Sequence, residues 1–247
     1  MAITRNRFTG FAAFTFAAAL YTALPASAQN TSSVSSPGVD AGERGFEYRF
    51  GWTPGENGRG DSFAHRFDYA FSLNERQGVK VIAVVDDKAG RDARLNYVGG
   101  EFIWEVTPED ARVWQSALRV DGRISNGSTP EQIGFDWINR WTLGPRWHAR
   151  AMVATSKEFG DRADDGIGIE ARASLNYNLG GGYKAALLFF NKLGTLDDFG
   201  TDGQRQQIGP TLSGPLGNGW GWTVGNLFGV SDAAPDNDVR IWLSRDF

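Results

Sequence analysis

The sequence places charged residues of opposite sign two positions apart, inside short runs in which polar and apolar residues alternate. Clear cases are Glu47/Arg49, Arg119/Asp121/Arg123 and Glu170/Arg172. Residues two apart in a β-strand point to the same face. Side chains arranged in this way can brace a structure through ion pairs, or they can line a polar passage and concentrate a solute of opposite charge. The charged residues therefore predict a polar surface built on strands.

Nucleophilic catalysis needs a Ser or Cys beside a base, most often His. The chain has no Cys and only two His. His65 stands in an aromatic run, where a place in an interfacial aromatic girdle is expected, and no Ser on its strand shares its face. His148 shares its face with Arg140 and Arg150, which favours a neutral or structural ring. The sequence therefore predicts no catalytic residue and no enzyme.

A carboxylate pair is the remaining candidate for acid–base chemistry. Asp121 and Asp136 could meet across neighbouring strands, but the basic residues Arg119, Arg123 and Arg140 would neutralise them. No His, Asp and Glu cluster has metal-ligand spacing, and no phosphate-binding loop or nucleic-acid-binding pattern is present. We expect no metal, no cofactor and no nucleic-acid partner.

The elements that must position these charges are strands, because the period-two pattern begins near residue 45 and continues to the last residue. Phe46, Tyr48 and Phe50 share one face of the first strand, opposite Glu47 and Arg49. The pattern predicts twelve strands of about the length that crosses a bilayer when tilted. They cover 45–53, 62–73, 79–86, 95–106, 113–124, 133–143, 146–156, 166–179, 183–193, 204–214, 219–230 and 238–247.

The connections between these strands alternate long and short, beginning with a long one. Outer-membrane barrels have long extracellular loops and short periplasmic turns, so this order predicts that both ends of the barrel chain lie in the periplasm. Two strands are weakly supported: 79–86 is apolar on both faces, and 204–214 contains Pro210. Without that pair the barrel would have ten strands. The predicted fold class is an all-β, antiparallel, up-and-down transmembrane β-barrel of about twelve strands.

One face of each strand must meet lipid and the other the lumen, and the aromatic stripes are assigned to lipid. The predicted lumen-lining residues include Arg49, Arg66, Arg119, Asp121, Arg123, Asp136, Arg140, Arg150, Glu170, Arg172 and Arg240. With the other charged residues of that face they make eleven basic and seven acidic groups, a net charge of about +4. This predicts either a passage that mildly favours anions or a wall braced by its own ion pairs.

The chain before residue 45 has two parts. Residues 1–28 have a basic start, an apolar stretch too short to span a membrane as a helix, and a small-residue pattern at Ala26–Ala28, which predicts a cleaved signal peptide. Residues 29–44 are polar and Ser-rich, which predicts a flexible lead-in to a barrel over 45–247. The absence of Cys excludes a disulfide scaffold, and the high Gly and aromatic content suits a barrel.

The chain ends on VRIWLSRDF, in which Val239, Ile241 and Leu243 alternate with polar residues before the terminal Phe247. This ending resembles the C-terminal strand of Gram-negative outer-membrane β-barrel proteins. The resemblance implies recognition by the barrel-assembly machinery and places the protein, exported through its signal peptide, in the outer membrane with lipid and lipopolysaccharide as neighbours. Arg245 departs from the family pattern, and we expect it to reach the headgroup region.

The favoured function is a porin-like channel or transporter for small solutes, with a lumen that mildly favours anions. The alternative is a non-conducting structural or surface-interaction barrel, and a third hypothesis is a membrane-embedded lipid hydrolase. The sequence leaves open which solute passes, whether the lumen is open, and the oligomeric state. It also leaves open the role of the acidic long loops and of the stretch Arg59-Gly60-Asp61.

Overall fold

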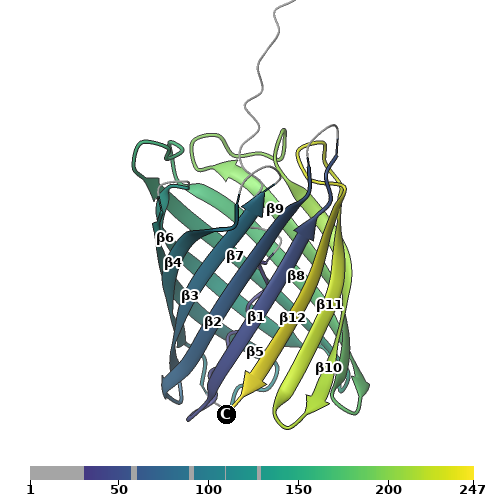
Figure 1. The fold of residues 1–247 in the computed structure, drawn as a ribbon. Coiled ribbons are helices and arrows are strands. Elements are labelled where there is room, and N and C mark those ends of the chain that lie inside the picture. The colour runs from purple at the N-terminus through teal and green to yellow at the C-terminus, as the bar shows by residue number, and fades with distance from the viewer. Residues whose placement is uncertain (1–30, 57–59, 89–91, 109, 127–128) are drawn as a thin grey trace, which may run out of the picture.

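A computed structural model describes residues 31–56, 60–88, 92–108, 110–126 and 129–247. These residues form one closed barrel in which all neighbouring strands are antiparallel (Figure 1). The predicted signal peptide and Arg59 of the Arg59-Gly60-Asp61 stretch lie outside the described residues. No helix among the described residues is long and apolar enough to cross a membrane.

The barrel has twelve strands, and the prediction of an all-β up-and-down barrel is confirmed. The strands are β1 Arg44–Thr53, β2 Ser62–Asn74, β3 Gln77–Lys88, β4 Arg94–Glu105, β5 Trp114–Ser125, β6 Glu131–Thr142, β7 Trp147–Phe159, β8 Gly168–Gly180, β9 Tyr183–Thr195, β10 Gln206–Gly217, β11 Trp220–Gly229 and β12 Asn237–Asp246. Both weakly supported strands exist as β3 and β10, so the ten-strand alternative is wrong. Pro210 pairs with Leu187 of β9 but has no register partner on β11, which suits a residue without an N–H.

The last strand closes the barrel against the first. Tyr48 lies opposite Leu243 and Phe50 opposite Ile241 in the register of β1 and β12. The backbone N–H of Phe247 donates to the carbonyl of Arg44 at 2.9 Å, just beyond the paired strands. Closure leaves no free sheet edge, which is the requirement for a strand protein in lipid.

The connections follow the predicted alternation of long and short with one exception: 106–113 is longer than the connections 89–93 and 126–130, which belong to the opposite end of the barrel. The two-residue turns 75–76, 181–182 and 218–219 lie at one end of the barrel, together with the connections 106–113 and 143–146. The loops 54–61, 160–167, 196–205 and 230–236 lie at the other end. The chain's C-terminus lies at the end with the short turns (Figure 1), which we call the turn end, and the opposite end is the loop end.

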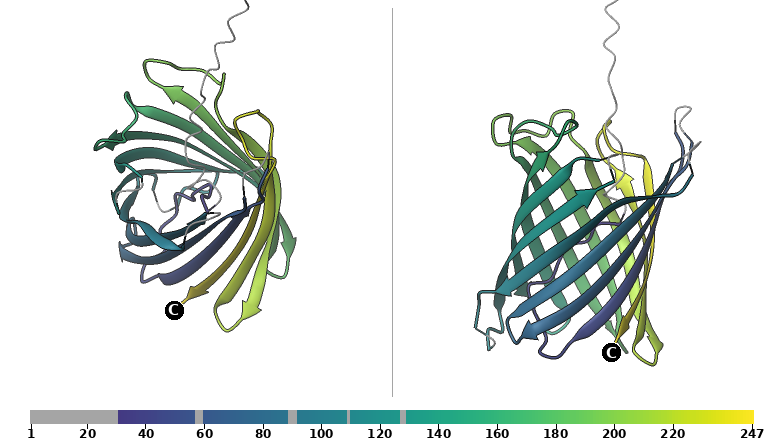
Figure 2. Two further views of the ribbon diagram at one scale, coloured as in Figure 1. Left: turned by 45° about the horizontal axis from the view of Figure 1, so that its top comes forward. Right: turned by 60° about the vertical axis from the view of Figure 1, so that its left-hand side comes forward.

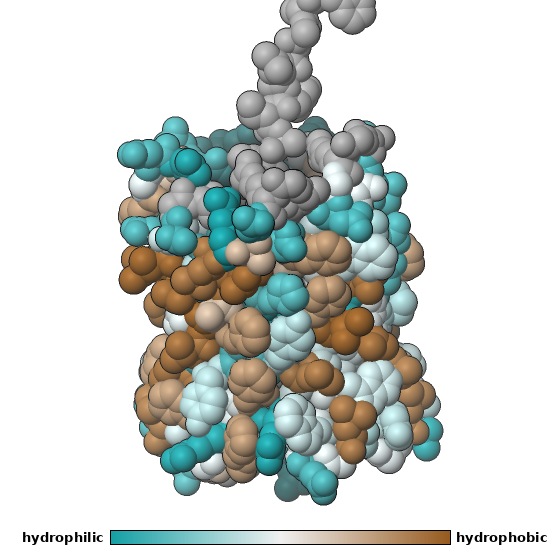
Figure 3. Space-filling view, viewed as in Figure 1, coloured by the Kyte–Doolittle hydropathy of each residue, from teal (hydrophilic) through white to brown (hydrophobic). Residues whose placement is uncertain are grey.

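The alternation of the strands separates an apolar outer surface from a buried inner one. On β3, Val81 is 55% exposed and its neighbour Ile82 only 5%; on β6, Trp137 is 50% exposed and Ile138 is fully buried. Brown and pale side chains make up most of the visible barrel wall, with scattered hydrophilic ones, below a hydrophilic rim at the loop end (Figure 3). The alternation of residues within each strand therefore predicted the outer and inner faces of these strands correctly.

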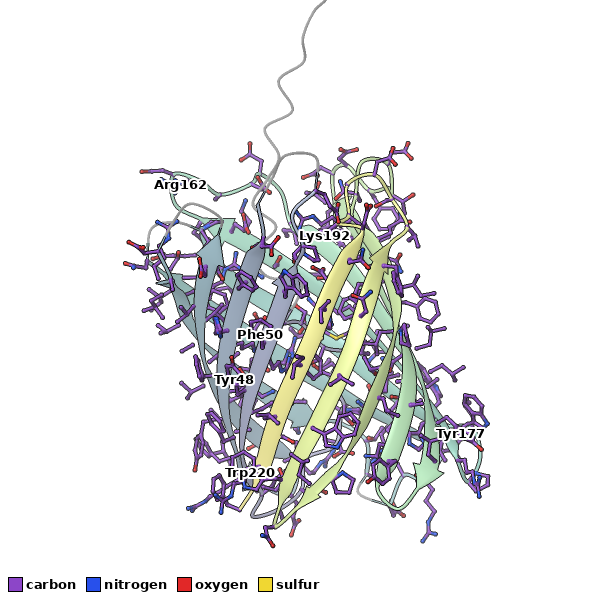
Figure 4. The ribbon with its side chains drawn as sticks, turned by 45° about the vertical axis from the view of Figure 1, so that its right-hand side comes forward. Tyr48, Phe50, Arg162, Tyr177, Lys192 and Trp220 are labelled. Atoms are coloured by element: carbon purple, nitrogen blue, oxygen red, sulfur yellow. The ribbon has the colours of Figure 1, made fainter. Side chains whose placement is uncertain are left out.

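Aromatic side chains make up much of the outer surface. Tyr48 and Phe50 lie at mid-height on the wall, and Trp220 lies near the turn end (Figure 4). The guanidinium of Arg245 lies 5.3 Å from the ring of Trp220 and 5.0 Å from that of Phe247. Arg245, the residue that departs from the family ending, is therefore held over aromatic faces at the turn end of the barrel.

Candidate functional site: the barrel lumen

The strands carry the predicted lumen-lining residues on their inner face, where Arg49, Asp136 and Arg240 are buried. The barrel brings many of these residues together through the strand register. Arg119 of β5 lies opposite Asp136 of β6, and Arg140 of β6 lies opposite Arg150 of β7. The first pair joins opposite charges and the second joins like charges, so the lumen contains both braced and unbraced sections.

An ion-pair network braces the wall formed by β1 to β6. Glu101 of β4 is its centre, with one carboxylate oxygen 3.3 Å from Nη2 of Arg66 and the other 3.2 Å from Nη1 of Arg119. Asp68 accepts from Nε of Arg66 at 2.7 Å, and Asp136 is paired with Arg119. These side chains are nearly enclosed, so each charge depends on its partner rather than on bulk water.

Two further pairs lie outside this network. Nη2 of Arg123 is 3.1 Å from Glu158, and Nη2 of Arg172 is 2.7 Å from Glu170. The predicted bracing role therefore applies to many of the predicted lumen residues. Asp121 packs over Gly134, where its carboxylate leaves no room for a Cβ.

Besides Lys192, which lies opposite Glu170 in the register of β8 and β9, three basic side chains of the lumen have no carboxylate within ion-pair distance among the described residues: Arg140, Arg150 and Lys184. Because Arg140 and Arg150 are cross-strand partners, their like charges add. These residues lie on β6, β7 and β9, towards the turn end of each strand. They are the part of the lumen in which positive charge is not compensated.

The formal charge of the lumen is less positive than the sequence predicted. Glu101, Asp86, Glu158 and Asp238 are also on the inner face, as their contacts with Arg66, Asn96, Arg123 and Gln207 show. These four carboxylates offset the expected excess of positive charge. The structure therefore corrects the estimate of about +4, and any preference for anions depends on where the unpaired bases lie.

The described part of the Ser-rich lead-in lies inside the barrel. The start of the described chain is visible within the lumen in the left view of Figure 2. Thr31 is 1% exposed, Ser32 9% and Val34 6%. A polar segment was expected to be flexible, but its backbone carbonyls accept hydrogen bonds from donors on the wall, which the strand pattern alone could not predict. We call residues 31–39 the inner segment.

Arginines from several strands hold the inner segment by its backbone. Four successive carbonyls accept bonds from four different arginines. The bonds are Arg49 Nη1 to Thr31 at 2.9 Å, Arg240 Nη1 to Ser32 at 2.6 Å, Arg172 Nη1 to Ser33 at 3.2 Å and Arg150 Nη1 to Val34 at 3.5 Å. Nη1 of Arg119 also donates to the Ser35 hydroxyl at 2.9 Å, and the backbone N–H of Val39 donates to Glu105 at 3.3 Å.

An apolar contact fixes the middle of the inner segment. Val34 packs in a buried cluster with Leu188, Phe190 and Leu227, all of which face inward from β9 and β11. The guanidinium of Arg240 lies 4.8 Å from the centre of the Phe190 ring. The interior apolar residues of these strands therefore pack around the inner segment, as lumen-filling residues would.

A cavity of about 460 Å³ lies in the lumen beside the inner segment. Its wall includes Arg150 and Lys184, two of the unpaired bases, together with Glu101. It extends to Gly78, next to the short turn 75–76, and Glu43 lines it as well. The unfilled part of the lumen therefore includes uncompensated positive charge.

The geometry gives no support for a catalytic centre. His65 lies on the outer face, where its Nδ1 is 2.8 Å from the Tyr48 hydroxyl and its ring is tilted against Phe50 at 5.4 Å. No hydrogen bond joins a Ser hydroxyl to either His within the described part of the chain, and no group of metal-ligating residues is present there. His65 thus belongs to the outer aromatic surface.

Known proteins resemble this chain in fold rather than in sequence. No protein-family model and no curated protein matches the sequence. The KdgM porin structure has a TM-score of 0.57 at 12% identity, covering 82% of this chain and 99% of the porin. The NanC porin structure has a TM-score of 0.59 at 11% identity, covering 82% of this chain and all of the porin. A further KdgM porin structure, in complex with disordered oligogalacturonate, matches with the same TM-score of 0.57. The chain has the fold of a porin-like outer-membrane barrel.

Proposed function

We propose that the protein is a channel of the outer membrane that passes small solutes and prefers anions. The observation that carries the proposal is the cavity lined by Arg150 and Lys184, two bases that form no ion pair with a carboxylate of the described residues. A low-dielectric wall concentrates the field of such charges in the lumen and raises the local concentration of anions. The resemblance in fold to the KdgM and NanC porins supports a channel.

The test is single-channel recording in planar bilayers with a salt gradient across the membrane. We expect discrete conductance steps and a reversal potential on the anion side. The double change Arg150→Gln and Lys184→Gln should move the reversal potential towards the cation side, because it removes two uncompensated charges from the cavity wall. If that potential does not move, these side chains do not line the pathway, and if the wild type shows no steps, the protein is not a channel.

The matched control for this double variant is Arg162→Gln. Arg162 is an exposed residue of the loop 160–167, at the loop end of the barrel (Figure 4). It carries the same charge as Arg150 but lies outside the lumen, and mobile salt screens an exposed charge over about 8–10 Å. Its replacement should leave the reversal potential at the wild-type value.

A second function, a non-conducting barrel that braces the envelope or presents its loops, is favoured by one observation. The inner segment and the ion pairs of β1 to β6 fill much of the lumen. The same recordings decide between the two functions. We do not propose enzyme activity, because no nucleophile–base pair is formed by the described residues.

The route to the membrane is also part of the proposal. Cleavage after Ala28 would leave Gln29 as the first residue of the exported chain, and the barrel domain would follow the lead-in. Val239, Ile241, Leu243 and Phe247 would carry the assembly signal. Ile241, Leu243 and Phe247 are exposed on the described surface, as recognition of the last strand requires.

A further inference from the structure

The inner segment lies across the centre of the barrel rather than along one wall. Arg49 of β1 and Arg150 of β7 both donate to it, and these strands are six apart in the closed ring of twelve. They therefore stand opposite each other, and a chain that both can reach lies between them. The segment and the cavity thus share one cross-section of the lumen.

The oxygens of the inner segment occupy the positions that an anionic solute would need. Thr31, Ser32, Ser33 and Val34 each present a carbonyl oxygen to an arginine. Arginine forms its strongest hydrogen bonds with carboxylate or phosphate oxygens, which carry full negative charge. A neutral carbonyl is a weaker acceptor at the same site. Arg49 and Arg172 also pair with Glu47 and Glu170, so the advantage of an anion is largest at Arg150, which has no carboxylate within ion-pair distance among the described residues.

The attachment of the inner segment allows it to leave. Its C-terminal side continues into β1 at Arg44, and cleavage after Ala28 would leave a free chain end two residues before Thr31. The bonds that hold it come from side chains and not from a strand ladder, and two of its apolar residues are buried: Val34, in the apolar cluster, and Pro37. Withdrawal would therefore leave the closed sheet unchanged.

We propose that the inner segment is a plug which competes with anionic solutes for the arginine site of the channel. The inference rests on the proposed channel function and adds to it a binding site and its occupant. In the resting protein the carbonyls of residues 31–34 fill the site formed by Arg49, Arg150, Arg172 and Arg240. A solute carrying carboxylate or phosphate groups displaces them and opens the wider path.

Conductance tests the plug in the full chain. Val34→Lys places a positive charge in the apolar cluster beside Arg150, Arg172 and Arg240 and should expel the segment. Expulsion should raise the conductance by about twofold or more, since a twelve-strand barrel is wider than its side chains alone can fill. Ala41→Lys adds the same charge at an exposed residue just beyond the segment, and its conductance should equal that of the wild type. Deletion of residues 31–39 should match Val34→Lys and replaces it if that variant does not fold.

Thiol labelling tests the competition independently of conductance. The chain has no Cys, so Ser33→Cys gives one reporter inside the plug. Citrate, as the anionic probe, should accelerate its reaction with a maleimide severalfold, whereas glycerol at the same concentration should not. A labelling rate that citrate leaves unchanged overturns the competition.

The outcomes separate the plug from the channel. Conductance steps that are equal in the wild type, in Val34→Lys and in the deletion variant overturn the plug while the channel stands. An absence of steps in every variant overturns the channel. Folding is checked in each case by the compact mobility that an unheated barrel keeps on a denaturing gel.

Discussion

Glu101 holds the lumenal ion-pair network together, and Glu101→Gln should destabilise the barrel. Its carboxylate lies 3.3 Å from Arg66 and 3.2 Å from Arg119, and its side chain is 11% exposed. Breaking a buried ion pair costs about 3–5 kcal/mol, and each hydrogen bond to a charged group contributes about 1.5–3 kcal/mol. In the variant Arg66 still pairs with Asp68 and Arg119 still pairs with Asp136. The expected loss of unfolding free energy is therefore smaller than for a fully broken buried pair, about 2–3 kcal/mol.

Urea unfolding in detergent micelles, followed by tryptophan fluorescence, measures this loss. The control is Glu131→Gln, an exposed residue at the start of β6, which should change the unfolding free energy by no more than about 0.5 kcal/mol. Restoring the charge balance through Lys80→Met in the Glu101→Gln background should recover part of the loss, because Nζ of Lys80 is 3.8 Å from Glu101. A loss below about 1 kcal/mol for Glu101→Gln would refute the view that this network braces the wall.

Two further predictions concern the two surfaces and the mouth of the lumen. Val81→Arg puts a charge on the lipid face and should reduce the unfolding free energy by about 2–4 kcal/mol in lipid vesicles, whereas Ser213→Arg, on the cavity wall, should cost far less. A similar cost for both would contradict the assignment of faces. Burial, followed by the nearby carboxylates of Asp40 and Asp246, raises the pKa of Glu43, so this residue becomes neutral at a higher pH than an ordinary carboxyl. As the pH falls and Glu43 becomes neutral, the reversal potential should move towards anion selectivity. Protonation of Glu43 also stabilises the fold, and this stability is lost as the pH rises through the raised pKa of Glu43. Both pH effects should shrink in Glu43→Gln, and an unchanged pH profile in that variant would show that Glu43 does not face the pathway.

The sequence was sufficient to predict the strands and their faces because a barrel in lipid imposes a strict period of two. Even β3, apolar on both faces in the sequence, and β10, with its proline, occur where the spacing of the connections placed them. The same period could have identified Glu101, which shares its face with Glu105 four residues on, although the two glycines before it obscure the alternation. Contacts between strands could not be predicted, because one sequence does not specify register.

The inner segment could not have been predicted, and the reason is physical. Its hydrogen bonds use backbone carbonyls, which every residue type provides, so Thr31–Ser35 carries no residue pattern for them. Only Val34, the apolar residue within a run of polar ones, indicated a buried contact. The composition of a segment indicates whether that segment could form a core of its own. The position of the inner segment is determined instead by hydrogen-bond donors on the surrounding wall.

The way the arginines are satisfied links the stability of the barrel to its proposed function. Arg66 and Arg119 are bound to carboxylates that are fixed on the wall, and loss of those partners would leave buried charges uncompensated. Other arginines of the lumen, among them Arg150 and Arg240, also donate to carbonyls of a segment that the sheet does not hold. If that segment leaves, water or an anion can take its place, because the site borders a cavity of about 460 Å³. The first set of arginines is therefore structural, and the second can exchange its partner without unfolding the barrel, as a site for passing solutes must.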